Sequence, residues 1–98
     1  MPDYILLMHN DATAPLNVDD WGPYIAGLNA ADALQGGSAI GEGVCLRKTG
    51  PAPGITSHVS GFMRIGAASL DEARGLVSGN PVFEAGGTVE IRELPRTE

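Results

Sequence analysis

The chain is poor in several residue types, and some of these shortages exclude a class of protein. Its 98 residues include one cysteine, Cys45, which excludes a framework of internal disulfides and a zinc site built on several thiolates. Aromatic residues make up 5% of the chain, and its first 46 residues hold no lysine or arginine. No apolar run approaches the roughly 20 residues that a membrane-spanning helix needs.

The charges that are present are mostly acidic. Twelve acidic side chains stand against six basic ones, which gives a formal net charge of −6. Because clustered lysine and arginine bind phosphate backbones and anionic lipid surfaces, we expect neither nucleic acid nor a membrane as a partner. The N-terminus shows no basic segment followed by a long apolar run, so we expect a cytoplasmic protein. The length predicts one domain over residues 1–98.

The first half of the sequence predicts a strand, a helix and a second strand. The bulky apolar run at residues 4–8 is typical of a buried strand. From Asp19 or Asp20 onward, apolar side chains recur at helical spacing from Trp21 to Leu34, and Gly36-Gly37 ends this predicted helix. Residues 38–48 then predict a strand that two further glycines make irregular.

The second half repeats that order. Residues 56–66 alternate in character and predict a strand with Met63 and Ile65 on one face. Ser69 opens a capping box and therefore a helix, and residues 88–94 predict the last strand.

The order β-α-β-β-α-β predicts an α+β fold of the ferredoxin-like kind. Two right-handed crossovers place both helices on one face of a four-stranded antiparallel sheet, in which strand one lies between strands three and four. The other face is then uncovered, although it carries apolar side chains. We expect a second copy of the chain to cover it, so that a homodimer forms a dimeric α+β barrel.

Several short motifs, spread over nearly the whole chain, have the order and spacing of one known family. They are Tyr4-Ile-Leu-Leu-Met8, Trp21, Gly36-Gly37-x-x-x-Gly41-Glu42-Gly43, Gly61-Phe62, Ser69-Leu-Asp-Glu-Ala73, Asn80-Pro81 and Gly86-Gly-Thr-Val-Glu-Ile-Arg92. Through them the chain resembles the YCII-related (DGPF-domain) family. The resemblance implies a dimeric α+β barrel, with lyase or dehydrochlorinase-like activity in a few relatives. The Asp-Gly-Pro-Phe signature is absent, and the family's histidine–aspartate pair has no counterpart at the matching positions.

The uncovered sheet face gathers the candidate catalytic residues. His9 ends the first strand, and alternation places it on this face with His58 and Glu90 if Ile5 points the same way. A histidine beside a carboxylate can act as a general base near neutral pH, so His9 and Asp11 are predicted to be catalytic. The alternative interpretation is a hydrogen-bonded histidine at a strand end.

Four residues are predicted to bind the substrate. His58 and Glu90 border His9, Arg64 would hold a carboxylate or enolate, and Glu42 lies between two glycines that let a ligand approach. An alternative remains open, in which Arg64, Glu90 and Arg92 form an ion network that only fixes the register of the dimer.

These patterns lead to two functional hypotheses. In the first, a small homodimer binds a small polar or aromatic metabolite on the inner sheet face and acts as a cofactor-free lyase or isomerase. In the second, the chain is a non-enzymatic regulatory or interaction module. The sequence leaves enzymatic activity open. It offers no metal-ligand spacing, so we expect neither a metal nor a cofactor.

Overall fold

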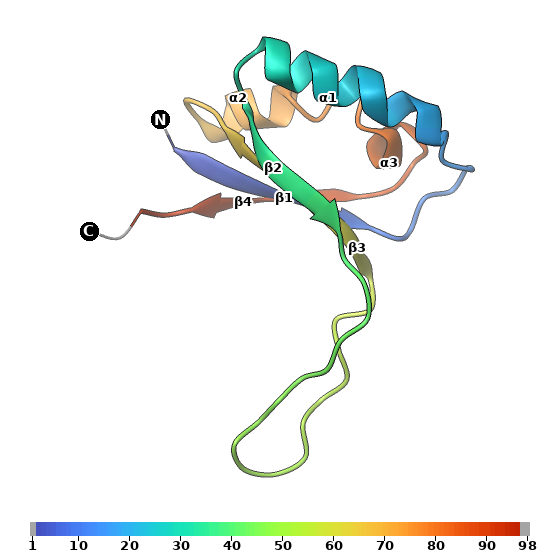
Figure 1. Ribbon diagram of the computed structural model, residues 1–98, viewed down its shortest axis with the longest axis vertical. Coiled ribbons are helices and arrows are strands. Elements are labelled where there is room, and N and C mark those ends of the chain that lie inside the picture. The colour runs from blue at the N-terminus through green and yellow to red at the C-terminus, as the bar shows by residue number, and fades with distance from the viewer. Residues whose placement is uncertain (1, 97–98) are drawn as a thin grey trace.

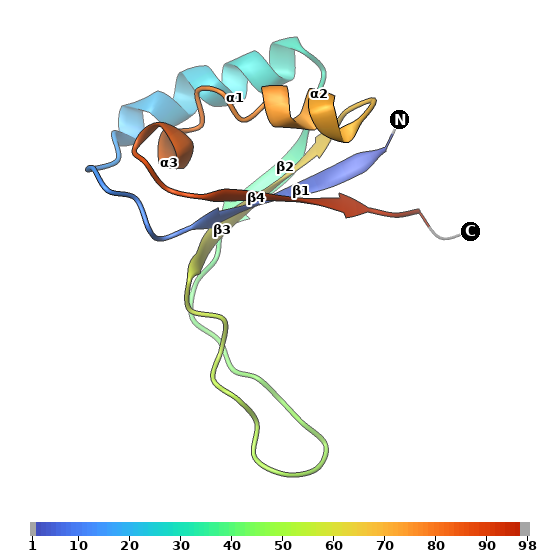
Figure 2. The ribbon, with the colours of Figure 1, turned by 180° about the vertical axis from the view of Figure 1, so that it is seen from behind.

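The chain folds into one four-stranded antiparallel sheet with all its helices on the same side. The structure, a computed structural model, describes residues 2–96. The strands lie in the order β2-β3-β1-β4, so β1 is central. They are β1 (Asp3–His9), β2 (Leu34–Ala39), β3 (Val59–Gly66) and β4 (Val89–Leu94). Figures 1 and 2 show the helices above the sheet from both sides, and this confirms the predicted ferredoxin-like α+β fold.

The helices occupy the two crossovers. They are η1 (Val18–Asp20), α1 (Trp21–Ala30), α2 (Leu70–Gly75) and α3 (Pro81–Glu84). The predicted capping box is confirmed, since the Ser69 hydroxyl accepts a hydrogen bond from the Glu72 N–H at 3.1 Å. Asn80 caps α3 in the same way, and Pro81 occupies the first turn, where no N–H is needed. The second crossover therefore holds two short helices, where the sequence predicted one.

The end of α1 and the start of β2 differ from the sequence prediction. Helix α1 ends at Ala30, and Asp32 takes a left-handed conformation with φ of 54°, which turns the chain back toward the sheet. Leu34, which was predicted to be the last apolar residue of the helix, is the first residue of β2. The strand expected at 38–48 is therefore wrong in its bounds: β2 ends at Ala39.

The core lies between the sheet and the helices. In β1, Tyr4, Leu6 and Met8 are buried and alternate with half-buried residues, as period-2 packing requires. Met63 and Ile65 of β3 face the same layer, as predicted. From the helical side, Tyr24 and Leu28 are buried on α1, and Trp21 packs against the cluster from its edge.

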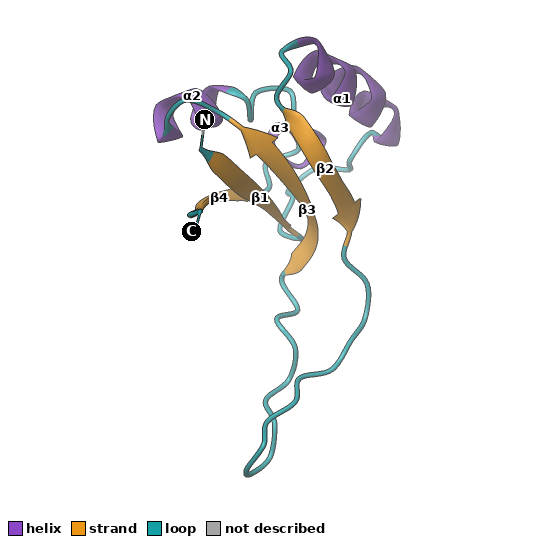
Figure 3. Cartoon of the chain, turned by 60° about the vertical axis from the view of Figure 1, so that its left-hand side comes forward, coloured by secondary structure: helices purple, strands orange, loops and turns teal. Residues whose placement is uncertain are grey.

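A long segment between β2 and β3, here called the arm (residues 40–58), projects away from this core. It contains no helix or strand and hangs below the sheet in Figures 1 and 3. Val44 and Leu46 are 81% and 91% exposed there. The arm carries one acid and two bases, whereas the rest of the chain carries eleven acids and four bases.

Candidate functional site

The sheet face that the helices leave uncovered, here called the open face, carries the candidate site. Because the residues of β1 alternate, Ile5, Leu7 and His9 lie opposite the core and are half-buried. The register pairs Leu7 with Phe62 of β3 and with Glu90 of β4, so those two residues share the face. The predicted orientation of β1 is thus confirmed, and the open face mixes apolar and ionisable side chains.

His9 and Glu90 form the centre of the site. The His9 Nε2 atom lies 3.0 Å from Glu90 Oε1, and the two side chains are 18% and 34% exposed. Arg92 donates a hydrogen bond from NH1 to the second carboxylate oxygen, Oε2, at 3.3 Å. The hydrogen bond from His9, and then the one from Arg92, lower the pKa of Glu90 below its usual value of 4.5. Glu90 is therefore an ionised acceptor that orients the imidazole.

His58 lies beside His9 at the end of the arm. The centroids of the two rings are 5.0 Å apart, and their planes are inclined by 76°, which is an edge-to-face contact. Two hydrogen bonds from Asn10 fix the junction between β1 and the end of the arm. The Asn10 backbone N–H donates to the carbonyl of His58 at 2.9 Å, and Asn10 Nδ2 donates to the carbonyl of Ser57 at 3.0 Å. A register irregularity after Met8 accompanies the junction.

Asp11 is bound to Thr88, the residue directly before β4. Its carboxylate accepts hydrogen bonds from the Thr88 backbone N–H at 2.8 Å and from the Thr88 hydroxyl at 2.7 Å. The Thr88 hydroxyl, followed by its N–H, lowers the pKa of Asp11. The carboxylate on the His9 ring is therefore that of Glu90, and the catalytic role predicted for Asp11 stays a prediction.

The other two predicted substrate-binding residues lie apart from this centre. Arg64 shares the open face, where it pairs with Ile5, and its side chain is exposed. Within residues 2–96, its guanidinium makes no hydrogen bond or ion pair, although its charge contributes to lowering the pKa of Asp3. Glu42 lines a separate cavity of about 510 Å³ at the base of the arm, together with Asn10 and Val59. The structure thus brings His9, His58 and Glu90 together, and leaves Arg64 and Glu42 outside the contact.

Three residues around this centre were not among the predicted site residues. Arg92 completes the pairing of Glu90, Thr88 holds Asp11, and Asn10 fixes the loop that carries His58. Arg92 had a sequence signal, since it follows Glu90 by two residues and therefore lies on the same face of a strand. Thr88 and Asn10 had none that sets them apart from other polar residues in turns.

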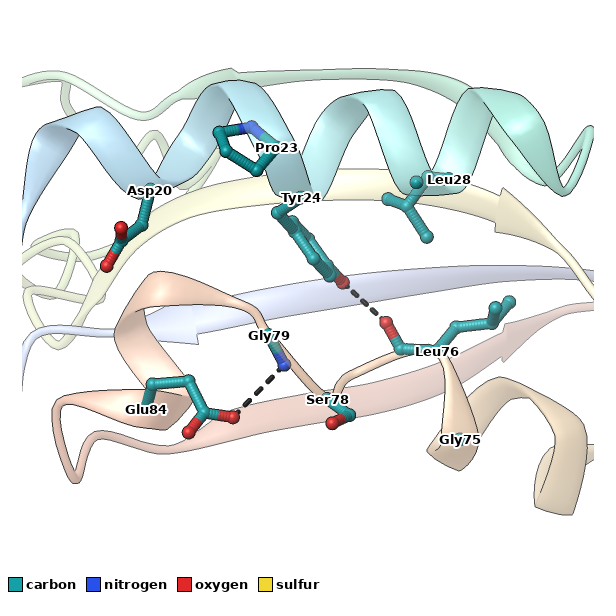
Figure 4. Close-up of a pocket in the computed structure, with 10 residues that line it drawn as sticks. Asp20, Pro23, Tyr24, Leu28, Gly75, Leu76, Ser78, Gly79 and Glu84 are labelled. Carbon is teal, nitrogen blue, oxygen red and sulfur yellow. Dashed lines mark hydrogen bonds between the residues drawn. The ribbon is translucent and has the colours of Figure 1, made fainter.

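A cleft on the helix side lies away from these residues. It has a volume of about 530 Å³ between α1 and the segment that links α2 to α3, and Figure 4 shows its lining. The Tyr24 hydroxyl donates to the carbonyl of Leu76 at 2.7 Å, and the Gly79 N–H donates to Glu84 Oε2 at 3.0 Å (Figure 4). Burial raises the pKa of the Tyr24 hydroxyl. These polar groups already have hydrogen-bond partners. The hydrogen bond from Tyr24 links α1 to the second crossover, so we interpret the cleft as part of the packing between them.

Metal ligands and membrane-spanning helices can be judged over residues 2–96. In that range, His, Cys, Asp and Glu side chains nowhere gather in a group of three that could hold a metal ion. None of the helices formed by the same residues has the length and apolarity that crossing a bilayer requires.

Comparison with known proteins identifies a structural relative. No family profile matches the sequence, and no curated protein is similar to it. Among solved structures, the chain is similar to 5-chloro-2-hydroxyhydroquinone dehydrochlorinase from Burkholderia phenoliruptrix AC1100, in complex with 2,5-dihydroxybenzoquinone. The TM-score is 0.60 at 18% identity, over 99% of this chain and 96% of that one. At this identity the likeness shows the fold, and it agrees with the ferredoxin-like α+β arrangement of the sheet.

Proposed function

We propose that the chain is a small homodimer of the YCII-related (DGPF-domain) type that binds a small polar or aromatic metabolite on its open face. Its activity is that of a cofactor-free lyase or isomerase, with His9 as the general base. The single observation that carries the proposal is the contact of 3.0 Å between His9 Nε2 and Glu90 Oε1 on a sheet face that no helix covers.

The hydrogen bond determines how His9 would act. When Nε2 carries the proton that the Glu90 carboxylate accepts, Nδ1 carries the lone pair and is the basic atom. Nδ1 takes a proton from a carbon next to a carbonyl or quinone group, and the electron pair of that C–H bond moves into the ring or carbonyl system. In an isomerase the imidazolium returns the proton to another carbon, and in a lyase a leaving group departs with the electron pair.

The structural relative supports this class of reaction. A dehydrochlorinase removes hydrogen chloride from its substrate, and that relative was solved with a hydroxylated quinone bound. Such ligands are planar, and they carry oxygen atoms that acquire negative charge when a proton leaves. Arg64, on the same face as His9, would receive that charge.

The second copy is proposed from the composition of the open face. Ile5, Leu7 and Phe62 form an apolar row on it beside charged side chains, and they are half-buried in the single chain. Burial of such a row stabilises a dimer by about 25 cal/mol for each Å² of apolar surface removed from water. Leu7→Glu is therefore expected to give a monomer by light scattering. Leu70→Glu, at a position on α2 that is 52% exposed, is the matched control and keeps the dimer.

Ligand binding by the intact protein tests the site. The probe is 2,5-dihydroxybenzoquinone, titrated by calorimetry into the wild type and into the His9→Asn and Glu90→Gln variants. We expect binding to the wild type and at least tenfold weaker binding to both variants. Glu93→Gln removes the same charge from the same strand on the opposite face and should bind as the wild type does. Equal affinity of all four proteins would remove His9 and Glu90 from the site.

A second candidate function is a non-enzymatic interaction or regulatory module. The arm favours it, since Val44 and Leu46 are among the most exposed apolar side chains and contribute little to the core. Under this alternative, 2,5-dihydroxybenzoquinone does not shift the melting temperature of the wild type. Val44→Ser together with Leu46→Ser then changes the assembly state, while folding is preserved.

A further inference from the structure

A cavity lies on the helix side of the sheet, opposite the open face. Its volume is about 590 Å³, and it lies between α1 and the half of the sheet formed by β2 and β3. Its main side chains are apolar: Met8, Leu16, Trp21, Ile25, Leu34, Met63 and Val82. This volume falls within the 300–1,000 Å³ range that is typical of small-molecule sites.

The sequence of β2 explains why this space is not filled. The register places Gly37 opposite Met63 and Ala39 opposite Gly61, so these small residues face the helix layer where larger ones would complete a core. A Cβ atom at Gly37 would come within 2.6 Å of the Phe62 carbonyl oxygen, which means that the close approach of the two strands requires glycine there. The gap under α1 is thus a consequence of strand packing that a larger side chain at Gly37 cannot repair.

The lining residues define the chemistry of an occupant. None of the residues around the cavity is charged. The hydroxyls of Ser38 and Ser60 already donate to the carbonyls of Ala39, at 2.9 Å, and of Met8, at 3.3 Å. Within residues 2–96, the Trp21 indole N–H makes no hydrogen bond, and it is the one free side-chain N–H of the lining.

We propose that this cavity binds a neutral, largely apolar molecule of one or two rings that carries a single hydrogen-bond acceptor. The rings contact Trp21, and the thioethers of Met8 and Met63 adapt to their shape. An anion is disfavoured, since its charge would be buried with no cation beside it. The site lies on the other side of the sheet from His9, so the proposal does not depend on the proposed function.

The single tryptophan of the chain makes the proposal directly measurable. Trp21 lines the cavity, so its fluorescence reports a bound molecule without labelling. The probe is 6-propionyl-2-(dimethylamino)naphthalene, a neutral two-ring fluorophore with a carbonyl acceptor, whose absorption overlaps tryptophan emission. We expect saturable quenching of Trp21 and a matching rise in probe emission. The sulfonated anionic relative, 6-(dimethylamino)naphthalene-2-sulfonate, should bind at least tenfold more weakly.

Two variants that fill the cavity from opposite walls locate the binding. Ala39→Phe adds a ring from β2, and Ile25→Phe adds one from α1 at a position that is 37% exposed and tolerant of change. Each should weaken binding of the neutral probe at least tenfold while the circular dichroism spectrum stays unchanged. The control is Ala26→Phe, on the same helix but outside the linings of the three cavities described above, and it should bind as the wild type does.

Three results would overturn the proposal. They are no quenching of Trp21 by the neutral probe, equal affinity for the sulfonated probe, and unchanged binding in whichever filling variants fold. His9→Asn separates the two sites, because it should leave quenching of Trp21 intact whether or not it abolishes binding of the quinone.

Discussion

His9 Nε2 and Glu90 Oε1 lie 3.0 Å apart, although 81 positions separate the two residues in the chain. The strand order explains the contact, because β1 pairs directly with β4 and Leu7 lies opposite Glu90. His9 is the next residue of β1 on the same face, so its ring reaches the carboxylate diagonally across the pair. The contact is therefore built into the register of two paired strands and does not depend on a loop.

Glu90 should reveal this contact in its titration. Because the hydrogen bond from His9 is the largest cause of its lowered pKa, His9→Asn should move the pKa of Glu90 back up toward 4.5. Arg92→Gln should raise it by less. Side-chain carboxyl NMR between pH 2 and pH 6 measures both changes. Arg74→Gln removes a guanidinium that is bound to Asp71 on α2, and the Glu90 midpoint should not respond to it.

Asp11 should make the stability of the fold depend on pH. Its folded pKa is lowered by Thr88, so its contribution is present above the unfolded value of about 3.9 and is lost as the pH falls through the folded pKa. Asp11→Asn should therefore melt at a lower temperature than the wild type at pH 7. The difference should close toward pH 2. A constant difference across this range, measured by thermal scans, would show that the charge of Asp11 is not involved.

Two glycine substitutions should have opposite effects. Gly27 lies inside α1, and no neighbouring atom lies within 4 Å of the position that a Cβ would take, so Gly27→Ala should stabilise the fold by about 0.5–1 kcal/mol. Gly37→Ala would place its Cβ against the Phe62 carbonyl and should destabilise the fold by roughly 1–3 kcal/mol. Urea unfolding of the two variants gives the comparison. Equal changes in the free energy of unfolding would mean that β2 shifts away from β3 to accommodate the Cβ atom with no loss of stability.

Asn80 should be needed for α3 to begin where it does. It is fully buried, and its Oδ1 accepts hydrogen bonds from the N–H groups of Val82, at 3.0 Å, and Phe83, at 3.3 Å. Asn80→Ala removes this cap and should cost about 1–2 kcal/mol of unfolding free energy. Asn80→Ser keeps a capping oxygen and should recover part of the loss. Denaturant titration of both variants tests this ranking.

The sequence predicted the layers of the fold better than the ends of its elements. Period-2 alternation placed Met63 and Ile65 toward the helices and His9 away from them, because one-sided burial fixes strand faces strongly. It failed at Leu34, which continues the helical spacing of α1 but follows the left-handed turn at Asp32. An aspartate tolerates the left-handed conformation. Because aspartate also occurs on the surface of helices, its presence at position 32 does not predict a turn there.

Two features of the candidate site could not be predicted from the sequence: the conformations of its long side chains and the course of the arm. Strand order alone brought His9 near Glu90, because that contact depends on backbone register. Which arginine reaches Glu90 depends on side-chain conformation: of the two arginines in the alternative ion network, Arg92 bonds to Glu90 and Arg64 does not. Glu42 lies in the arm, and no periodic pattern in the sequence predicts the course of this segment. The separation of Glu42 from the site could therefore not be predicted.

Met8 and His9 are neighbours in the chain, yet they belong to different surfaces of the molecule. Met8 lines the apolar cavity under α1, and His9 meets Glu90 on the far side of the sheet. One peptide unit joins them, at the point where the pairing of β1 with β3 changes register. The flexible thioether of Met8 can adapt to a molecule in the cavity without moving the backbone, whereas any shift of the Met8 backbone passes to His9 through this single peptide unit.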